Sequence, residues 1–360
     1  MNSSILDYYL PSERIARFPA QKRDESRLLV YDRKSGNVSH AVFKDLPQIL
    51  PHPYDFFRND AAVLKGRIFA KKPSGANVEC LLLSPHSDPF KWTCMLKPGK
   101  RLPVGSKFGV ESLFEATVEE KFEDGSATVS FDTQNKTSVI DVSEKIGVVP
   151  LPPYIARKQN APDYDRNFDN ERYETVYADP SKRVAAAAPT AGLHFTKELV
   201  RSLEEKGSAF HNLTLHVGIG TFQPLKSRNV EDHKMHSEIY EIPSETLRAI
   251  TSSKLGRLAV GTTSLRAMED FSRKNSEKHF DVLRGYTDAA SLFVYPPQRI
   301  ISAEAMVTNF HLPRSTLMCL VAAFLSPDSE DGIRLLKELY AQAVEKQYNF
   351  YSYGDAMLIL

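Results

Sequence analysis

Short apolar stretches separated by turn residues fill the chain between residues 64 and 149. Their alternating and β-branched residues indicate strands at 67–70, 78–83, 91–96, 113–122 and 127–131. Pro98-Gly99 and Asp124-Gly125 supply the fixed or positive φ angles that tight connections require. Regularly spaced short strands with such turns are typical of a small barrel or sandwich, so this segment predicts an all-β module.

A different pattern follows the run Pro150-Leu151-Pro152-Pro153, which cannot continue a strand because proline lacks the N–H that a ladder needs. Helical and strand patterns alternate after it and also in the first part of the chain. The expected helices are 45–50, 197–206, 265–271, 317–325 and 332–345, and the expected strands are 27–31, 213–217 and 258–260. This alternation predicts an α/β fold. We therefore predict a discontinuous α/β domain at 1–63 and 150–360 that carries an inserted small all-β barrel domain at 64–149.

The charge balance excludes a bulk positive field as the means of attracting nucleic acid. Forty-six Lys and Arg residues face 45 Asp and Glu residues in a 360-residue chain, which gives a formal net charge of +1. A local patch would have to serve instead. One candidate contains Lys91, Lys97, Lys100, Arg101 and Lys107, with no acidic residue between them. A solvated strand edge protected by lysines explains the same pattern equally well.

The three cysteines, Cys80, Cys94 and Cys319, argue against a disulfide framework and against a thiolate zinc site. Their odd number and wide spacing suit a reducing compartment. The first residues carry several charges where a signal peptide would be apolar. The longest apolar run, 317–325, is far shorter than the ~20 residues of a membrane helix. We therefore expect a cytoplasmic protein.

The segment Val260-Gly261-Thr262-Thr263-Ser264-Leu265-Arg266 combines a strand end, a small-residue loop and a helix start. Free N–H groups and the positive dipole end at a helix N-terminus form an anion site, to which two threonines add hydroxyl groups. Simple helix capping is the alternative. Arg266 favours an anion, because a cation in the first turn opposes the helix dipole unless an anion is bound.

A second strand end carries Gly218 and Gly220, which allow close approach of the backbone to a ligand. A dinucleotide fingerprint needs a third glycine where Gln223 stands, so a Rossmann nicotinamide site is excluded. A β-bulge or strand-end turn is the alternative interpretation.

Histidines gather in the second half of the chain, where seven of the ten lie between residues 194 and 311. Imidazole titrates near neutral pH, so this clustering suits proton transfer. His233 and His236 lie three residues apart, which can serve as ligand spacing for zinc, but no HExxH motif and no paired cysteines support such a site, and we predict no metal. A hydrogen-bonded structural role stays open for each single histidine.

The last ten residues, 351–360, are largely apolar, which predicts a buried C-terminal strand or docked segment. Asp355 follows Gly354 within this stretch. Its carboxylate either orients a catalytic group or closes a turn.

Together these segments resemble the S-adenosylmethionine:tRNA ribosyltransferase-isomerase family of queuosine biosynthesis. The matching runs are 23–30, 150–155, 172–178, 187–196, 214–224, 233–238, 259–266, 309–317 and 351–359. The resemblance implies an enzyme that transfers and isomerises the ribosyl part of S-adenosylmethionine onto 7-aminomethyl-7-deazaguanine at the tRNA wobble position. The implied products are epoxyqueuosine-tRNA, adenine and methionine. S-adenosylmethionine is then a consumed substrate, with no cofactor, no membrane and no obligate protein partner implied. An α/β domain with an inserted β-barrel is also what the resemblance implies.

That chemistry requires a base for a hydrogen on the ribose carbon beside the sulfonium, and donors for the departing adenine and the oxyanions that follow. The proton-transfer candidates are His194, His216, His236 and Glu238, without a choice among them. We expect Thr262, Thr263 and Arg266 to hold the methionine carboxylate. Further substrate-binding residues are expected at Thr190, Gly192, Gly218, Gly220, Asn309, His311 and Asp355.

Several positions depart from the family pattern. They are Ala61, Ala62, Glu174, Pro297, Asn349 and the segment 180–186. The alanines replace polar residues, so a polar contact is expected to be missing there. These departures concern substrate affinity more than reaction type, because the loops nearest the expected chemistry are intact.

Two other functions fit parts of the sequence. A non-catalytic RNA-binding protein could grip a stem-loop with its barrel, using Trp92 beside Lys91. It would release no adenine. A methyltransferase would yield S-adenosylhomocysteine, but its usual glycine-rich strand-loop-helix is not evident near the start of the α/β part.

Overall fold

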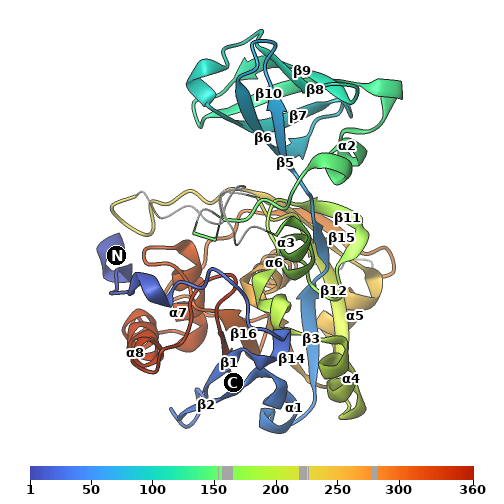
Figure 1. The fold of residues 1–360 in the computed structure, drawn as a ribbon. Helices are drawn as coiled ribbons and strands as arrows, with labels where there is room; N and C mark the ends of the chain where they lie inside the picture. Colours follow the sequence, from blue (N-terminus) through green and yellow to red (C-terminus); the bar gives the residue numbers. More distant parts are fainter. Residues whose placement is uncertain (153, 156–164, 219–224, 226, 277–281) are drawn as a thin grey trace.

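The computed structural model describes residues 1–360 except 153, 156–164, 219–224, 226 and 277–281. A large sheet with helices on its faces forms one body, and a small barrel stands beyond one end of that sheet (Figure 1). The chain enters the barrel from the sheet and returns to it, so the predicted α/β fold with an inserted all-β barrel is confirmed.

The large sheet has nine strands in the order β15-β13-β12-β3-β14-β16-β17-β1-β2. Its strands are β1 (Arg27–Tyr31), β2 (Val38–Val42), β3 (Tyr54–Asn59), β12 (Ala209–Leu215), β13 (Glu238–Ile242), β14 (Gly256–Val260), β15 (Tyr286–Ala290), β16 (Ala305–Asn309) and β17 (Ala356–Ile359). The neighbours β12, β3, β14 and β16 run parallel. Parallel strands end at the same edge, so the residues that follow these four strands meet there.

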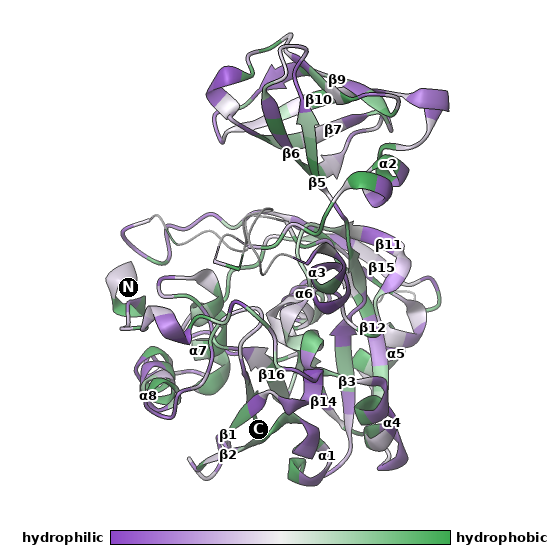
Figure 2. Ribbon diagram, in the orientation of Figure 1, coloured by the Kyte–Doolittle hydropathy of each residue, from purple (hydrophilic) through white to green (hydrophobic). Residues whose placement is uncertain are grey.

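Alternate residues of the central strands face two separate apolar layers. Phe56 of β3 packs with α4 (Lys197–Glu205) in one layer, while Phe57 faces the layer that contains α6 (Gly261–Lys274) and α7 (Thr316–Leu325). Both faces of the sheet are therefore covered, which explains the nearly continuous apolar runs of its inner strands. Figure 2 shows α7 almost entirely in hydrophobic colours, as its position inside a layer requires.

The remaining helices are α1 (Leu46–Ile49), α2 (Val139–Ile146), α3 (Arg166–Arg172), α5 (Ser244–Ser252) and α8 (Gly332–Glu345). Two predicted N-caps are confirmed. The Thr196 hydroxyl accepts from the Leu199 N–H at 3.1 Å, and that of Ser315 accepts from the Met318 N–H. The predicted C-terminal stop at Gly207 has φ +91°, in the left-handed region that favours glycine.

The barrel is closed by six antiparallel strands in the order β10-β7-β6-β5-β8-β9. They are β5 (Arg67–Lys71), β6 (Asn77–Pro85), β7 (Lys91–Lys97), β8 (Lys107–Val110), β9 (Phe114–Lys121) and β10 (Ser126–Thr133). Every second residue of β7 points inward, so Trp92, Cys94 and Leu96 fill a core separate from the sheet layers. The barrel strands lie within the predicted insert, whereas its borders at residues 64 and 149 stay a prediction.

Two predicted elements have other bounds in the structure, because the strand predicted at 213–217 is β12, Ala209–Leu215, and one helix begins earlier than predicted. The helix expected from Leu265 begins at Gly261, so the presumed loop Gly261-Thr262-Thr263-Ser264 is the first turn of α6. Gly261 makes this possible because its φ of +87° lets β14 turn directly into the helix. Several strands were not predicted, among them β8, whose four residues carry too little apolar pattern, and β2, β3, β13, β15 and β16 of the large sheet. The predicted burial of the C-terminal segment is confirmed, and of the two alternatives, strand or docked segment, the structure has the strand, β17, between β16 and β1.

Candidate functional site

Two cavities lie at the carboxyl ends of β14 and β16 and share Thr262, Thr263 and Leu317 in their walls. The central cavity has a volume of about 180 Å³, and the side cavity about 20 Å³. The central cavity is lined by polar residues from several loops, namely Tyr154, Thr190, Thr262, Thr263, Thr308, Asn309, His311, Ser315, Tyr351 and Ser352. Thr262 and Asn309, which the sequence placed in one site with His194, both line this cavity, whereas His194 is absent from its lining and contacts Asn309.

The first turn of α6 forms one wall of both cavities. Val260 is the N-cap residue, and no side chain caps the helix there. The alternative interpretation, simple side-chain capping, thus does not describe this helix start. The buried Thr263 hydroxyl has no hydrogen-bond partner among the described residues, although buried polar groups are nearly always bonded. A polar or anionic ligand group at this turn would satisfy both the hydroxyl and the free N–H groups.

Arg266 does not point its charge at an open anion site, because Glu238 of β13 already pairs with it. The Arg266 guanidinium also donates to the carbonyls of His236 at 2.9 Å, Ala290 at 2.8 Å and Leu292 at 3.3 Å. The Glu238 carboxylate accepts in addition from the Gly218 N–H at 2.8 Å. The anion that the position of Arg266 indicated is therefore a side chain of the protein. This arrangement favours a positioning role for Arg266 over direct contact with a methionine carboxylate.

His194 stands behind the wall of the central cavity. Its Nε2 accepts from the Asn309 amide at 3.1 Å, and its Nδ1 lies 2.8 Å from the Ser26 hydroxyl. The Asn309 carbonyl oxygen accepts in turn from the Thr190 hydroxyl at 2.9 Å. The histidine therefore fixes the orientation of Asn309, whose amide is shared between His194 and a threonine that lines the cavity.

Two buried histidines at the site are neutral near physiological pH. Burial lowers the pKa of His194 to about 3, and the nearby Arg23 charge contributes in the same direction. Burial alone lowers the pKa of His311 to about 3. His311 lines the central cavity, and its Nε2 lies 2.9 Å from the Thr308 hydroxyl. Neither ring offers a positive charge to a substrate at neutral pH.

These shifted pKa values predict that acid destabilises the protein. Below pH ~6.5 the unfolded chain protonates both histidines, while the native rings stay neutral down to about pH 3, so the unfolded state holds more protons. The free energy of unfolding should then fall by up to ~1.4 kcal/mol per pH unit for each ring, or about 2 kcal/mol between pH 7 and pH 5. Urea unfolding at both pH values should show that His311→Gln loses about 2 kcal/mol less than the unchanged protein over this interval. An identical pH dependence in the two proteins would contradict the assignment.

The other predicted site residues lie outside the central cavity. His216 pairs with Glu241 at 3.0 Å, and the exposed His236 contributes its backbone carbonyl to Arg266. Asp355 accepts from the backbone N–H groups of Arg27 and Asn349, each at 2.7 Å, so it closes the turn before β17. Burial raises the pKa of the Asp355 carboxyl, and these two N–H groups oppose that shift.

The predicted glycines have different environments. A Cβ at Gly192 would lie 2.0 Å from the Tyr177 hydroxyl, so packing requires glycine there. Gly218 donates to Glu238 behind the side cavity. Gly220 lies outside the described residues.

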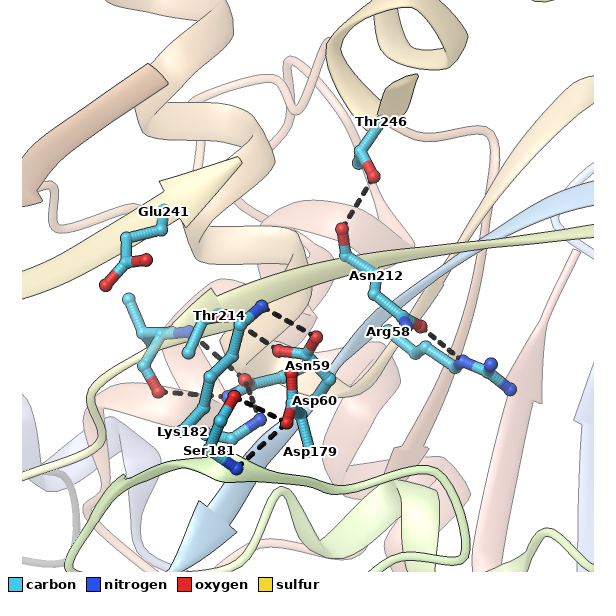
Figure 3. Close-up of polar contacts among 12 residues, drawn as sticks. Arg58, Asn59, Asp60, Asp179, Ser181, Lys182, Asn212, Thr214, Glu241 and Thr246 are labelled. Carbon is cyan, nitrogen blue, oxygen red and sulfur yellow. Dashed lines mark hydrogen bonds and ion pairs between the residues drawn. The ribbon is translucent and has the colours of Figure 1, made fainter. Parts of the chain in front are cut away.

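A buried polar network at the ends of β3 and β12 was missed by the sequence reasoning. Figure 3 shows Asp60 between Lys182, whose ammonium lies 2.9 Å from its carboxylate, and Thr214, whose hydroxyl donates at 2.7 Å. Asn59 bridges the same two strands through the N–H and the carbonyl of Leu215. The sequence did contain an indication of this network. Asn59 and Asp60 are polar residues at the end of an apolar stretch, a position where side chains often form hydrogen bonds to the neighbouring strand.

Some of the departures from the family pattern, namely Ala61, Ala62 and the segment 180–186, lie beside this network. Ala61 and Ala62 are buried in β4 (Ala61–Val63), which pairs with β11 (Asp179–Ala185), the strand formed by the unusual segment. That strand carries Lys182 to Asp60, so the buried carboxylate next to the alanines has a cationic partner. Glu174 pairs with Arg183 at 3.5 Å. Nothing in the structure explains the proline at position 297.

The barrel residues that suggested an RNA-binding module are engaged within the protein. Trp92 is 4% exposed, so it offers no ring for base stacking. Lys91 pairs with Glu119 at 2.8 Å, and Lys107 with Glu115 at 2.6 Å. The proposed basic patch therefore loses two of its five cations to neighbouring carboxylates.

Among the described residues, His, Cys, Asp and Glu side chains nowhere gather in a group of three or more that would suit a metal ion. Within the same part of the chain, none of the helices has the length and apolar character needed to span a membrane.

Comparison with known proteins assigns the chain to a family. The model of the family described as queuosine biosynthesis protein matches residues 3–359. Proteins called S-adenosylmethionine:tRNA ribosyltransferase-isomerase from Thermotoga maritima and Thermosipho africanus are each 40% identical, and each match covers 100% of both chains. The crystal structure of S-adenosylmethionine tRNA ribosyltransferase from Thermotoga maritima is similar with a TM-score of 0.53 and 31% identity, covering 99% of this chain and 100% of the other. The chain therefore belongs to the queuosine biosynthesis protein family.

Proposed function

We infer that this protein is an S-adenosylmethionine:tRNA ribosyltransferase-isomerase. It transfers and isomerises the ribosyl moiety of S-adenosylmethionine onto a tRNA base and forms epoxyqueuosine. The observation that carries this conclusion is the 40% identity over the full length of relatives with that name. The cavity between the α6 start and the end of β16 supports it, because polar loops from distant parts of the chain converge there.

The finer substrate assignment is a tRNA that carries 7-aminomethyl-7-deazaguanine at its wobble position. S-adenosylmethionine acts as the second substrate, and adenine and methionine leave as products. The central cavity, at about 180 Å³, has the scale of a buried pocket for part of a nucleoside rather than for a tRNA loop. Most of the tRNA must then lie on the outer surface.

The walls of the central cavity suit the charges that this reaction develops. Removal of a hydrogen beside the sulfonium opens the ribose, and the resulting oxyanions need hydrogen-bond donors held in place beforehand. The second N–H of the Asn309 amide and the Thr262 hydroxyl are such groups at the cavity, whereas the Thr190 hydroxyl donates to the Asn309 oxygen and holds that amide in place. We propose that these residues, with Thr263 and His311, surround the reacting ribosyl group.

The group that removes the hydrogen stays among His194, His216, His236 and Glu238. Glu238 lines the side cavity, so the geometry favours it, whereas both ring nitrogens of His194 are engaged, with the Asn309 amide and the Ser26 hydroxyl. His216 and His236 are more remote, since their contacts are with Glu241 and Arg266. A base at either remote position would require movement of the loops around it.

The turnover experiment tests the proposed function directly. The protein is incubated with S-adenosylmethionine and tRNA bearing the deazaguanine precursor, and the products are analysed by mass spectrometry. We expect adenine and methionine in equal amounts, together with the epoxide nucleoside in digested tRNA. S-adenosylhomocysteine as the product would make the protein a methyltransferase, and tRNA binding without adenine release would make it a binding protein.

A further inference from the structure

A second small cavity lies on the other side of the His194–Asn309 hydrogen bond from the central cavity. Two arginines line it, Arg23 in the short turn η3 (Arg23–Glu25) and Arg172 at the end of α3. His194 and Ser352 also belong to its wall. Ser352 borders both cavities, so a single layer of side chains separates them.

Reciprocal hydrogen bonds hold the two guanidinium groups beside each other. Arg23 donates to the carbonyl of Glu171 at 2.8 Å, next to Arg172, and to that of Leu193 at 3.3 Å. Arg172 donates to the carbonyls of Ala20 at 2.6 Å and Gln21 at 3.1 Å, close to Arg23. Within the described residues, neither arginine forms an ion pair with a carboxylate.

The positive charge at this place is thus incompletely balanced. Burial lowers the pKa of Arg23, and the adjacent Arg172 charge lowers it further, whereas the Glu171 charge acts in the opposite direction. Among the described residues, Glu174 also opposes the shift, but this carboxylate is paired with Arg183. The buried Nε of Arg172 has no hydrogen-bond partner among the described residues. Two like charges held together in a half-buried site normally indicate a place for an anion.

The size of the arginine cavity restricts the ligand. Its volume of about 10 Å³ corresponds to roughly one water-sized position. A complete free anion does not fit inside, but a single oxygen of a larger group does. Planar guanidinium groups suit the oxygens of phosphates and carboxylates, and arginines contact the nucleic-acid backbone in this way.

We propose that Arg23 and Arg172 bind a non-bridging oxygen of one tRNA backbone phosphate, beside the nucleotide whose base enters the central cavity. This inference rests on the proposed function, which makes a tRNA the substrate. The phosphate remains outside the arginine cavity and inserts one oxygen between the guanidinium groups. The contact positions the strand and carries no base specificity.

The test measures binding of the precursor tRNA to the full-length protein by filter binding at several salt concentrations between about 50 and 200 mM. Arg23→Gln and Arg172→Gln should each weaken the affinity for tRNA about tenfold. The slope of log K against log salt should become less steep by the amount that corresponds to the loss of about one phosphate contact. The KM for S-adenosylmethionine should stay within twofold. Arg172→Lys should keep the salt slope, because it keeps the charge, and should lose about threefold in affinity because the planar fork is gone.

Arg33 provides a matched control. It is also a half-buried arginine that donates to carbonyls, those of Leu360, Phe324 and Glu304, but it follows β1 at a distance from both cavities. Arg33→Gln should therefore leave the tRNA affinity and the salt slope unchanged. Thermal unfolding of all variants separates a loss of binding from a loss of folding. If the glutamine variants do not fold, the tRNA affinity and salt slope of Arg172→Lys provide the test.

Several results would overturn the inference. One is an unchanged tRNA affinity and salt slope in the folded glutamine variants, or an unchanged affinity in Arg172→Lys. Another is a raised KM for S-adenosylmethionine with unchanged tRNA binding, which would assign the arginines to the methionine carboxylate. The binding assay needs no turnover, so a wild-type protein that releases no adenine would contradict the proposed function without obscuring this result.

Discussion

Glu238→Gln is expected to lower the free energy of unfolding by about 3 kcal/mol, because it leaves the Arg266 guanidinium buried without a counter-charge. The side chains of Glu238 and Arg266 are only 6% and 8% exposed. Removing one partner of a buried ion pair typically costs about 3–5 kcal/mol. The lower end applies here, since the glutamine oxygen can still accept from the Gly218 N–H and Arg266 keeps its carbonyl acceptors.

Urea unfolding of the two proteins at neutral pH measures this difference. Glu241→Gln is the matched control, because it makes the same change on the same strand. Glu241 is 46% exposed and pairs with the partly exposed His216, so its loss should cost less than about 1 kcal/mol. Equal losses in the two variants would show that burial of the Glu238–Arg266 pair does not increase its contribution to the free energy of unfolding. Because whole domains are stable by only about 5–15 kcal/mol, a loss of this size at Glu238 would be readily measured.

The parts of the structure that sequence could predict are those encoded by nearby residues. The change from short alternating strands to alternating strands and helices identified the barrel and the α/β sheet. Thr196 and Gly207 delimited α4, since a cap and a left-handed glycine act within one helical turn. The apolar C-terminus predicted that the segment of β17 is buried, because that property is also visible in consecutive residues.

The site was predicted less completely because its interactions join residues far apart in the chain. Thr190 and Asn309 could be assigned to one pocket from their motifs, and the structure brings them within hydrogen-bond distance. The partner of Arg266, in contrast, depends on tertiary packing, which places Glu238 of β13 next to the first turns of α6. Burial likewise decides that His194 is neutral, and no local pattern reports burial of a histidine beside a helix cap. Motifs thus indicated which segments converge, whereas packing determines which side chain contacts which.

Asn309 is the residue through which this packing most directly affects the proposed chemistry. It is the last residue of β16, where an antiparallel neighbour, β17, and a parallel neighbour, β14, hold the strand on both sides. Its amide has a single orientation that satisfies both contacts, with nitrogen toward His194 and oxygen toward the Thr190 hydroxyl. A neutral His194 accepts at Nε2, and a protonated ring would repel the amide N–H. The low pKa of His194, about 3, therefore keeps Asn309 in place throughout the physiological range.

Asn309→Leu is consequently expected to reduce kcat for adenine release by about 10²–10³-fold, the usual effect of losing one preorganised polar group at a reacting centre. Leucine has a similar length, so the cavity keeps its shape while both polar contacts are lost. Asn212→Leu is the control, because Asn212 accepts from the Arg58 Nε at 2.7 Å in a polar network outside the cavity. It should leave kcat within about threefold, because the Asn212 side chain does not reach the cavity. If Asn309→Leu, compared at equal folded fraction, released adenine as fast as Asn212→Leu, the reacting group could not lie against Asn309. The central cavity would then be a structural gap rather than the place where the ribosyl group rearranges.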